Sequence, residues 1–316
     1  MELNLPVLNQ LSQCKNLLIA GMGGGFDVFC GLPIYFELTR RGQRVHLANF
    51  SFSDIENTQH GTRLTSTLVG IADAPGWIYP YFPEFYLARW FKEQQAQDVT
   101  VWCFQKTGTT PLLKNYRALV EHLEIDGILL IDGGVDSLMR GNEAGMGTVV
   151  EDATSLFVVN ELTEIPLRML ACIGFGAEQD VAYGHVLENI AAITKSGGFW
   201  GSCALVPQME SYQAYESAVL FVQSQPVHDP SVINSSMISS VRGEFGNYHL
   251  TPKTEGSRLW ISPLMSLYWF FDLEIVANRN LFLPNLANTL SFRDALRKTL
   301  EATSKTAKRP VGEIRL

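Results

Sequence analysis

The feature that most constrains the fold of this chain is a regular alternation of two kinds of segment. Short apolar runs rich in β-branched and aromatic residues alternate with longer segments whose apolar residues recur at helical spacing. Strands separated by helices in this way usually pair in parallel, with the helices packed on the sheet. Strands are predicted at 16–20, 44–49, 99–104, 127–131, 169–173, 199–204 and 259–261, and helices at 27–41, 84–94, 111–123, 151–161, 181–194, 209–223 and 292–303. The alternation therefore predicts an α/β protein with a mostly parallel sheet.

The alternation is clear up to residue 223 and weaker after it. Residues 1–223 are therefore predicted to form the α/β domain, and residues 224–316 a C-terminal extension that continues this domain or packs on it. Residues 50–83 contain Pro, Gly and aromatic residues without a clear period. This stretch is predicted to be an irregular excursion over the edge of the sheet.

Composition argues against several classes of protein. The formal net charge is −8 and no long run of Lys or Arg is present, so a broad nucleic-acid-binding surface is not expected. The most apolar segment, 261–277, is too short and too interrupted to cross a membrane, and the first residues lack the pattern of a signal peptide. The five cysteines are widely spaced and odd in number, which fits the cytoplasm better than a disulfide framework. We therefore expect a cytoplasmic protein, and the sequence leaves open whether it forms a homo-oligomer.

The stretch LIAGMGGGFDVFCGLP, residues 18–33, places a glycine-rich turn directly after the first predicted strand. In an open parallel sheet, ligands bind outside the carboxyl ends of the strands, and the first such turn often holds a phosphate. Gly23, Gly24 and Gly25 allow positive φ angles and let backbone N–H groups approach an anion closely. Asp27 is predicted either to bind a ligand hydroxyl or metal-bound water beside that anion, or to cap a helix. The turn is thus a candidate phosphate site, with a corner that binds nothing as the alternative.

Known glycine motifs do not match this turn. The dinucleotide pattern G-x-G-x-x-G that begins at Gly21 would need glycine at position 26, where Phe26 stands. Asn49 lies near the position of the acidic residue expected after the second strand, so a standard NAD site and the usual S-adenosylmethionine site are disfavoured. No Gly-Lys-Ser/Thr follows, which argues against a P-loop. We assign Asn49 to the predicted ligand-binding residues of a non-standard site.

A second glycine-acid turn follows the fourth predicted strand, in the sequence IDGGVDS at 131–137. It resembles the SGGxDS signature of the PP-loop ATP pyrophosphatases, but Asp132 replaces the first serine and no long helix follows at once. Asp132 comes directly after a buried strand, where a polar group needs a partner. Asp132 and Asp136 are therefore predicted to be catalytic, and Gly133 and Gly134 to bind the ligand.

A third turn, GFGAEQD at 174–180, follows the fifth predicted strand and carries Glu178. If the three strands are neighbours, their turns line one crevice. Carboxylates in such a crevice are candidate general acids or bases and are also preferred ligands of Mg²⁺ or Ca²⁺. Glu178 is accordingly predicted to be catalytic together with Asp132 and Asp136, whereas the acids at 151–152 are predicted to open a helix. The need for a metal stays open, with Mg²⁺ as the candidate cofactor.

Four segments of the chain are similar to a known family: GMGGGFDV, DGGVDSLMRGNEAGMGT, the EDA that follows, and SPLMSLYWFFDLE. In these segments the chain resembles an uncharacterised prokaryotic family, the domain of unknown function 1152. The resemblance covers most of the chain, and it implies a Rossmann-like α/β protein of the cytosol. With the alternation, it gives the predicted fold, a Rossmann-like doubly wound, mostly parallel sheet with helices on both faces. It implies no reaction and supplies no catalytic residue.

The three turns together predict an enzyme that binds a nucleotide or another phosphorylated small molecule. Group transfer or hydrolysis is favoured over hydride transfer, because the NAD determinants are absent. Two alternatives stay open: a non-catalytic nucleotide or metabolite sensor that uses the same crevice, and an atypical NAD- or S-adenosylmethionine-dependent enzyme. If the carboxyl groups of Asp27, Asp132, Asp136 and Glu178 converge on one small cavity, an enzyme is favoured over a sensor.

Overall fold

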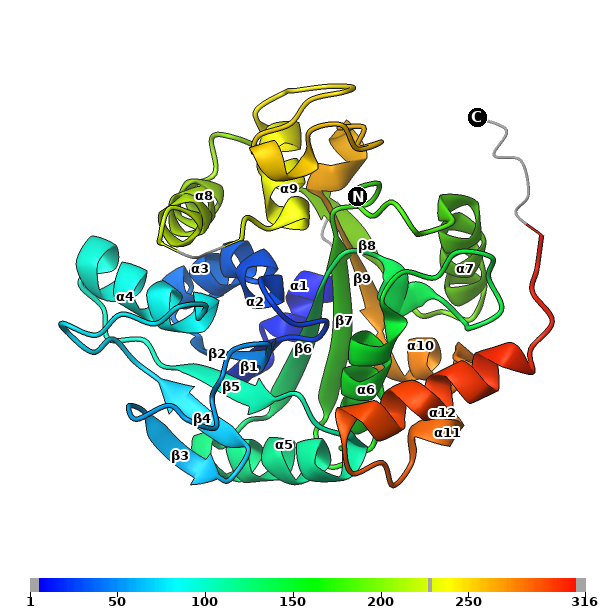
Figure 1. Cartoon of the computed structure of the whole chain (residues 1–316), viewed down its shortest axis with the longest axis horizontal. Coiled ribbons are helices and arrows are strands. Elements are labelled where there is room, and N and C mark those ends of the chain that lie inside the picture. Colours follow the sequence, from blue (N-terminus) through cyan, green and yellow to red (C-terminus); the bar gives the residue numbers. More distant parts are fainter. Residues whose placement is uncertain (1–5, 227–228, 311–316) are drawn as a thin grey trace.

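The computed structural model describes residues 6–226 and 229–310, which form one nine-stranded sheet with helices packed against it (Figure 1). The strand order is β3-β4-β5-β2-β1-β6-β7-β9-β8. The strands are β1 (Asn16–Gly21), β2 (Arg44–Ser51), β3 (Thr62–Thr65), β4 (Leu68–Ile71), β5 (Val101–Gln105), β6 (Gly127–Gly133), β7 (Leu167–Ile173), β8 (Phe199–Ala204) and β9 (Leu267–Asp272). The α-helices are α1 (Pro6–Leu11), α2 (Asp27–Cys30), α3 (Leu32–Arg40), α4 (Pro83–Gln95), α5 (Thr109–Leu123), α6 (Val149–Asn160), α7 (Tyr183–Lys195), α8 (Glu210–Gln223), α9 (Val232–Val241), α10 (Leu273–Arg279), α11 (Leu283–Leu286) and α12 (Phe292–Ser304). Three 3₁₀ turns complete the elements: η1 (Asp136–Leu138), η2 (Pro252–Thr254) and η3 (Pro263–Ser266). The α/β class is therefore confirmed.

The middle of the sheet is parallel, as predicted, and consists of β5, β2, β1, β6 and β7. Ala20 of β1 lies opposite Ala48 of β2 on one side and Leu130 of β6 on the other. Every residue of β1 is buried, which explains why this strand is an apolar run without polar alternation. Because these strands are parallel, their carboxyl ends lie at one edge of the sheet, and the three glycine-acid turns leave from that edge.

Helices cover both faces of the sheet. Side chains alternate along β1, so that Leu17 and Ile19 pack in a core with α2, α3, α4 and α8. Leu18 and Ala20 point the other way and pack in a second core with α5, α6 and α12. Figure 1 shows these two groups of helices on opposite sides of the sheet. None of the helices within residues 6–226 and 229–310 is long and apolar enough to span a lipid bilayer.

The structure corrects part of the prediction for residues 50–83: residues 52–61 and 72–82 are irregular, as expected, but two strands lie between them. Here β3 and β4 form an antiparallel hairpin, and β4 pairs antiparallel with β5, so the hairpin extends the sheet. All four residues of β4 are buried. Gly70 within it lies so close to the next strand that a Cβ would come 2.8 Å from the Trp102 ring. Burial of this short run against β5 outweighs the turn-forming residues around it.

The segment after residue 223 contributes β9, which lies between β7 and β8 and is antiparallel to both. The strand predicted at 259–261 is wrong, because Ile261 forms only an isolated bridge with Gly246. The longer run LYWFFD forms the strand instead, with Phe270 and Phe271 buried on opposite faces of the sheet. Both pairs formed by β9 are therefore antiparallel, whereas the strands in the centre of the sheet are parallel.

The helix predicted at 27–41 is interrupted at Gly31, which separates α2 from α3. A Cβ on Gly31 would lie 2.5 Å from Cγ2 of Ile19, so this glycine lets the helix approach β1 closely. Pro33 in the first turn of α3 has no N–H to continue the hydrogen bonds of α2. The interruption keeps α2 short and holds its first residue, Asp27, over the end of β1.

Candidate functional site

A cavity of about 540 Å³ lies at the carboxyl ends of β1, β6 and β7. The three strands are neighbours in the sheet, so the turns that follow them meet there. Six acidic side chains line the cavity: Asp180, which is exposed, and a cluster of five, namely Asp27, Asp132, Asp136, Asp152 and Glu178. The structure thus brings together the four carboxyl groups whose convergence would favour an enzyme, and it adds Asp152.

The glycine turn after β1 is folded around Asp27. The backbone N–H of Gly23 donates a 2.6 Å hydrogen bond to Oδ2 of Asp27. Gly24 and Gly25 have φ angles of +98° and +58°, which residues with a side chain rarely adopt. A Cβ on Gly24 would overlap the ring of Phe52, so this part of the turn lies under an aromatic side chain. Gly23 lines the cavity, whereas Gly24 and Gly25 are not among its lining residues.

Asp132 and Asp136 come from the second glycine-acid turn. Asp132 is in the last part of β6, and its Oδ2 accepts hydrogen bonds from the backbone N–H and the hydroxyl of Ser137. Asp136 begins η1, and its Oδ2 accepts a 2.7 Å hydrogen bond from the N–H of Thr148. Gly147 packs directly on Asp136, where a Cβ would overlap the carboxyl group. Both carboxyl groups are therefore fixed by the backbone around them.

Asp152 and Glu178 complete the cluster. Asp152 lies in the first turn of α6, and its Oδ1 is buried without a hydrogen-bond partner among the described residues. Glu178, after β7, accepts a 2.8 Å hydrogen bond from the N–H of Val135. Gly134 leaves room for Glu178, since a Cβ there would lie 2.8 Å from its carboxyl carbon. The first turn of α6 and the turn after β7 therefore each add one carboxyl group to the cluster.

The sequence prediction missed Asp152 as a site residue, because an acid in the first turn of a helix normally stabilises the helix dipole. Its neighbour Glu151 lies in the same first turn and forms a 2.7 Å ion pair with Lys106, the residue that follows β5. The available signal was the buried side of α6, which places Asp152 among Val149, Ala153 and other buried residues.

Burial and mutual repulsion raise the pKa values of the clustered carboxyl groups. Burial and then repulsion from Asp136 raise the pKa of Asp27 to about 7, although the hydrogen bond from Gly23 lowers it. The pKa values of Asp132 and Asp152 lie well above the usual range, first because of burial and then because of the neighbouring acids. The pKa of Asp136 is raised by burial, although a hydrogen bond between the Asp136 and Asp152 carboxyl groups lowers it.

The protein itself supplies little positive charge to this cluster. Among the described lining residues, Lys253 is the one cationic side chain, and it pairs with Asp229 at 2.8 Å. The pKa of Glu178 is likewise well above its usual range, because of burial and then repulsion from Asp136 and Asp132. The carboxyl groups can therefore all be ionised together only if a cation compensates their charge, and without one some of them keep their protons.

Asn49, predicted to bind ligand, lies outside the cavity lining. It is fully buried at the end of β2, where its Nδ2 donates hydrogen bonds of 2.9 Å to Gly25 O and 2.8 Å to Glu84 Oε1. Asn49 thus ties the glycine turn to α4. Gly133 lines the cavity and Gly134 supports Glu178, so the ligand-binding roles of these two residues stay predictions.

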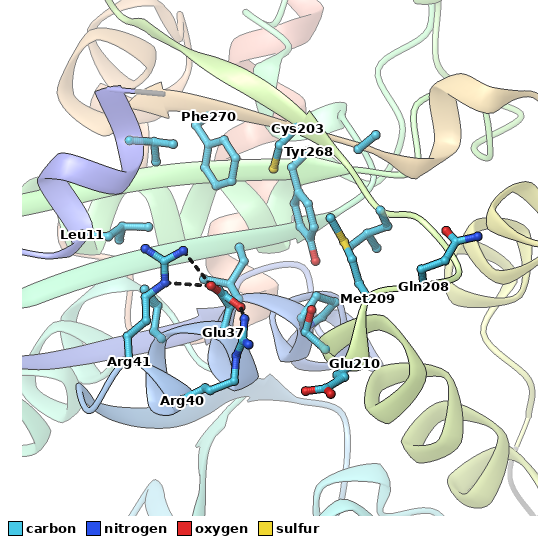
Figure 2. A pocket seen from close by; sticks show the side chains of 17 residues that line it. Leu11, Glu37, Arg40, Arg41, Cys203, Gln208, Met209, Glu210, Tyr268 and Phe270 are labelled. Atoms are coloured by element: carbon cyan, nitrogen blue, oxygen red, sulfur yellow. Dashed lines mark hydrogen bonds and ion pairs between the residues drawn. The ribbon is translucent and has the colours of Figure 1, made fainter. Parts of the chain in front are cut away.

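A second cavity, of about 560 Å³, lies between α1, α3, the start of α8 and the β8–β9 edge (Figure 2). Tyr268 and Phe270 project into it from the sheet, and Glu37 lies between Arg40 and Arg41 at its rim. Glu37 forms ion pairs with both arginines, so their charge is already partly compensated. The described residues that line this cavity include charged side chains at its rim but no cluster of buried carboxyl groups.

The sequence profile of a family described as a protein of unknown function (DUF1152) matches residues 86–307, more than half of the chain. The match includes Asp132, Asp136, Asp152 and Glu178, whereas Asp27 lies before it. Comparisons with curated proteins and with solved structures gave no match. The resemblance seen in the sequence is confirmed, and the chain belongs to the DUF1152 family.

Proposed function

We propose that the protein is an enzyme that binds a nucleotide or another phosphorylated small molecule in the acidic cavity and catalyses hydrolysis or group transfer on it. The observation that carries this proposal is the convergence of five carboxyl groups on one cavity. Helix caps and surface acids are normally solvated, but Asp132, Asp136 and Asp152 are each at most 3% exposed. Clustered, buried acids with raised pKa values are costly for stability and are typical of functional sites.

Asp136 and Glu178 are the acid–base candidates. One oxygen of each is fixed by a backbone N–H, from Thr148 for Asp136 and from Val135 for Glu178. A carboxyl group with a raised pKa exchanges its proton closer to neutral pH, so it can protonate a leaving group or accept a proton from water or a hydroxyl. Asp132 remains a catalytic candidate that would orient the reacting group.

The size and the rim of the cavity favour a small polar ligand. Its volume of about 540 Å³ is within the range of small-molecule pockets. Lys253, Thr254 and Ser257 also line the cavity, and they offer a cation and hydroxyl groups to a phosphate or a sugar. The parallel centre with helices on both faces also supports the finer fold proposal, a Rossmann-like doubly wound sheet, in which ligands bind at strand ends.

A ligand screen that measures binding and turnover separately tests this proposal. Nucleotides and sugar phosphates, each with and without Mg²⁺, are screened by thermal shift, and the products are analysed chromatographically. We expect at least one ligand that stabilises the protein and is converted. Asp136→Asn and Glu178→Gln should still bind it but lose about 100-fold or more in turnover. Glu188→Gln, at an exposed position outside the cavity lining, is the matched control.

Two results would contradict the proposal that the protein is an enzyme acting on a phosphorylated ligand. Binding without conversion in the unchanged protein would identify the sensor instead. If no phosphorylated ligand shifted the unfolding midpoint, the assignment of the cavity to this ligand class would be wrong.

A further inference from the structure

Three of the clustered carboxylates have the spacing of ligands to a single ion. One oxygen each of Asp27, Asp132 and Asp152 lies within 4.8 Å of the other two. Oxygen ligands bind Mg²⁺ at about 2.1 Å and Ca²⁺ at about 2.4 Å, so two ligands on opposite sides of one ion are about 4.2–4.8 Å apart. The three oxygens can therefore contact the same cation without a large movement of the backbone.

An orphaned oxygen points independently to a missing partner. Oδ1 of Asp152 is buried and has no hydrogen-bond partner among the described residues, and Asp152 as a whole is 2% exposed. A buried carboxylate oxygen without a partner is strongly unfavourable, so such groups are normally paired or bind a metal. The other acids of the cluster do accept such hydrogen bonds. Ser137 donates to Asp132, Thr148 to Asp136 and Val135 to Glu178. Within the part of the chain that the structure describes, Asp152 contacts the Asp136 carboxyl group, and no N–H or hydroxyl donor reaches its Oδ1.

Two glycines keep the space around these oxygens free. A Cβ on Gly23 would lie 2.7 Å from Oδ2 of Asp27 and 2.8 Å from Oδ1 of Asp152. A Cβ on Gly133 would lie 2.7 Å from Oδ1 of Asp27. The φ angle of Gly23 is not in the positive range, so the backbone does not require glycine there. The absent side chain instead leaves room between carboxylates that come from different turns.

The chemistry of the donors selects the kind of ion. All three ligands are carboxylates, and hard divalent cations such as Mg²⁺ and Mn²⁺ prefer oxygen. The nearest sulfur donors are unsuitable, because burial raises the pKa of both the Cys30 and the Cys172 thiols. The one histidine of the adjoining helix α7, His185, pairs with Glu188 and is not part of the lining.

We propose that Asp27, Asp132 and Asp152 bind one divalent cation, Mg²⁺ or Mn²⁺, and that this cation makes the acidic cavity able to accept a phosphate. The role of the phosphate rests on the proposed function, whereas metal binding does not. Six acids and one lysine line the cavity, so an anionic ligand would be repelled by the protein alone. A bound cation offsets part of this negative charge and offers a phosphate oxygen a positive partner within the cavity.

The test measures metal binding without any substrate. The full chain is treated with EDTA and dialysed, and Mn²⁺ and Mg²⁺ are titrated by calorimetry, with electron paramagnetic resonance to count bound Mn²⁺. We expect one ion per chain and an unfolding midpoint that rises with metal concentration, because the ion binds only the folded state. Absence of binding would overturn the site, whether or not a phosphorylated ligand is later found.

Variants show where the ion binds. Asp152→Asn removes one charge from a repelling cluster, so in EDTA it should be at least as stable as the unchanged protein. It should nevertheless weaken Mn²⁺ binding by about tenfold or more, as expected for the loss of a ligand. Gly23→Ala, which fills the space between two ligand oxygens, should weaken binding as well. Asp180→Asn, an exposed acid on the same cavity lining, is the matched control and should bind normally.

A metal affinity that is the same in Asp152→Asn and in the unchanged protein would overturn the assignment. The same holds if Asp180→Asn lost as much affinity as Asp152→Asn, since binding would then reflect the overall negative charge of the cavity. Failure of the proposed function looks different, because metal would bind with the expected variant pattern while no phosphorylated ligand was bound or converted.

Discussion

The backbone N–H of Gly23 donates a hydrogen bond to the carboxylate of Asp27, four residues later in the same turn. The glycine-rich turn therefore already holds an anionic group, which belongs to the chain itself. A phosphate would have to compete with Asp27 for this N–H, or reach the turn through a cation bound to Asp27. This relationship favours a site in which the glycines position the acids.

The packing of Phe52 on Gly24 is tested by Gly24→Ala. The φ angle of Gly24 is +98°, and a Cβ there would overlap the Phe52 ring. The unfavourable backbone alone costs about 1–2 kcal/mol, and displacement of the ring adds to it. Gly42→Ala is the matched control, because Gly42 also has a positive φ, +85°, but no atom lies near its Cβ position.

Urea unfolding of the two variants compares these costs. We expect Gly24→Ala to lose clearly more stability than Gly42→Ala. Equal losses would show that Phe52 does not lie on the turn in solution.

The buried pair of Asn49 and Glu84 predicts a pH-dependent defect in Asn49→Asp. Burial raises the pKa of Glu84, although hydrogen bonds from Asn49 and from two serines lower it. An aspartate at 49 replaces the amide donor by a second carboxyl group, and its pKa in the folded state must be raised above that in the unfolded state. A raised pKa means that stability is retained at low pH and lost as pH rises through the folded value.

Unfolding of Asn49→Asp and Asn49→Ala at several pH values measures this effect. Asn49→Ala should lose about 1–3 kcal/mol, because two buried oxygens each lose a donor, with little change across the neutral range. Asn49→Asp should become progressively less stable than Asn49→Ala as the pH rises. Parallel pH profiles would mean that residue 49 does not contact Glu84.

Much of the fold was predictable because its signals are local. The buried runs at β1, β6 and β7 are continuous apolar segments, and glycine followed by an acid marks the turn after each of them. Placement of Asp132, Asp136 and Glu178 in one cavity needed only the further assumption that these strands are neighbours, and the structure shows that they are. The catalytic roles of these residues remain predictions.

The remainder depended on contacts between distant parts of the chain. The sequence of β9 does not reveal that it inserts antiparallel between β7 and β8, because the pairing of a strand is decided by its partners. Asp152 has the local sequence of an ordinary first-turn acid, and only the packing of α6 turns it towards Asp27 and Asp132. Asn49 was predicted to bind ligand because it stands near the position of the acidic residue in dinucleotide sites. Its actual partner, Glu84, lies on α4 and cannot be identified from the local sequence.

The second cavity predicts a distinctive thiol reactivity. Cys203 lines it and is partly exposed, whereas the other four cysteines are buried. Burial raises the pKa of Cys203 to about 11, so little thiolate is present at neutral pH. Labelling of the native protein with a thiol reagent should be slow and should quicken about tenfold for each unit of pH below 11. Cys203→Ser should abolish this phase, and an unchanged phase would show that another cysteine is the accessible one.

The buried carboxylate of Glu143, which accepts a hydrogen bond from Asn189 of α7, predicts that the stability of the protein falls in acid. Burial alone would raise its pKa, but hydrogen bonds from Asn189 and from the N–H groups of Arg140 and Gly141 outweigh this and lower the pKa to about 2. Arg309 also pairs with Glu143 at 2.9 Å and fastens the segment after α12. A lowered pKa means that stability is present above the unfolded value near 4.5 and is lost as pH falls towards 2.

Glu143→Gln isolates this contribution. The variant should be about 1.5–3 kcal/mol less stable than the unchanged protein near neutral pH, because a buried charged acceptor is removed from its donors. The difference should be constant above about pH 4.5 and close as the pH falls towards 2, where Glu143 becomes protonated in both states. Glu301→Gln, in an exposed pair with Arg297, should cost less than about 1 kcal/mol at any pH. A gap for Glu143→Gln that stayed open at low pH would show that its hydrogen bonds do not depend on the charge.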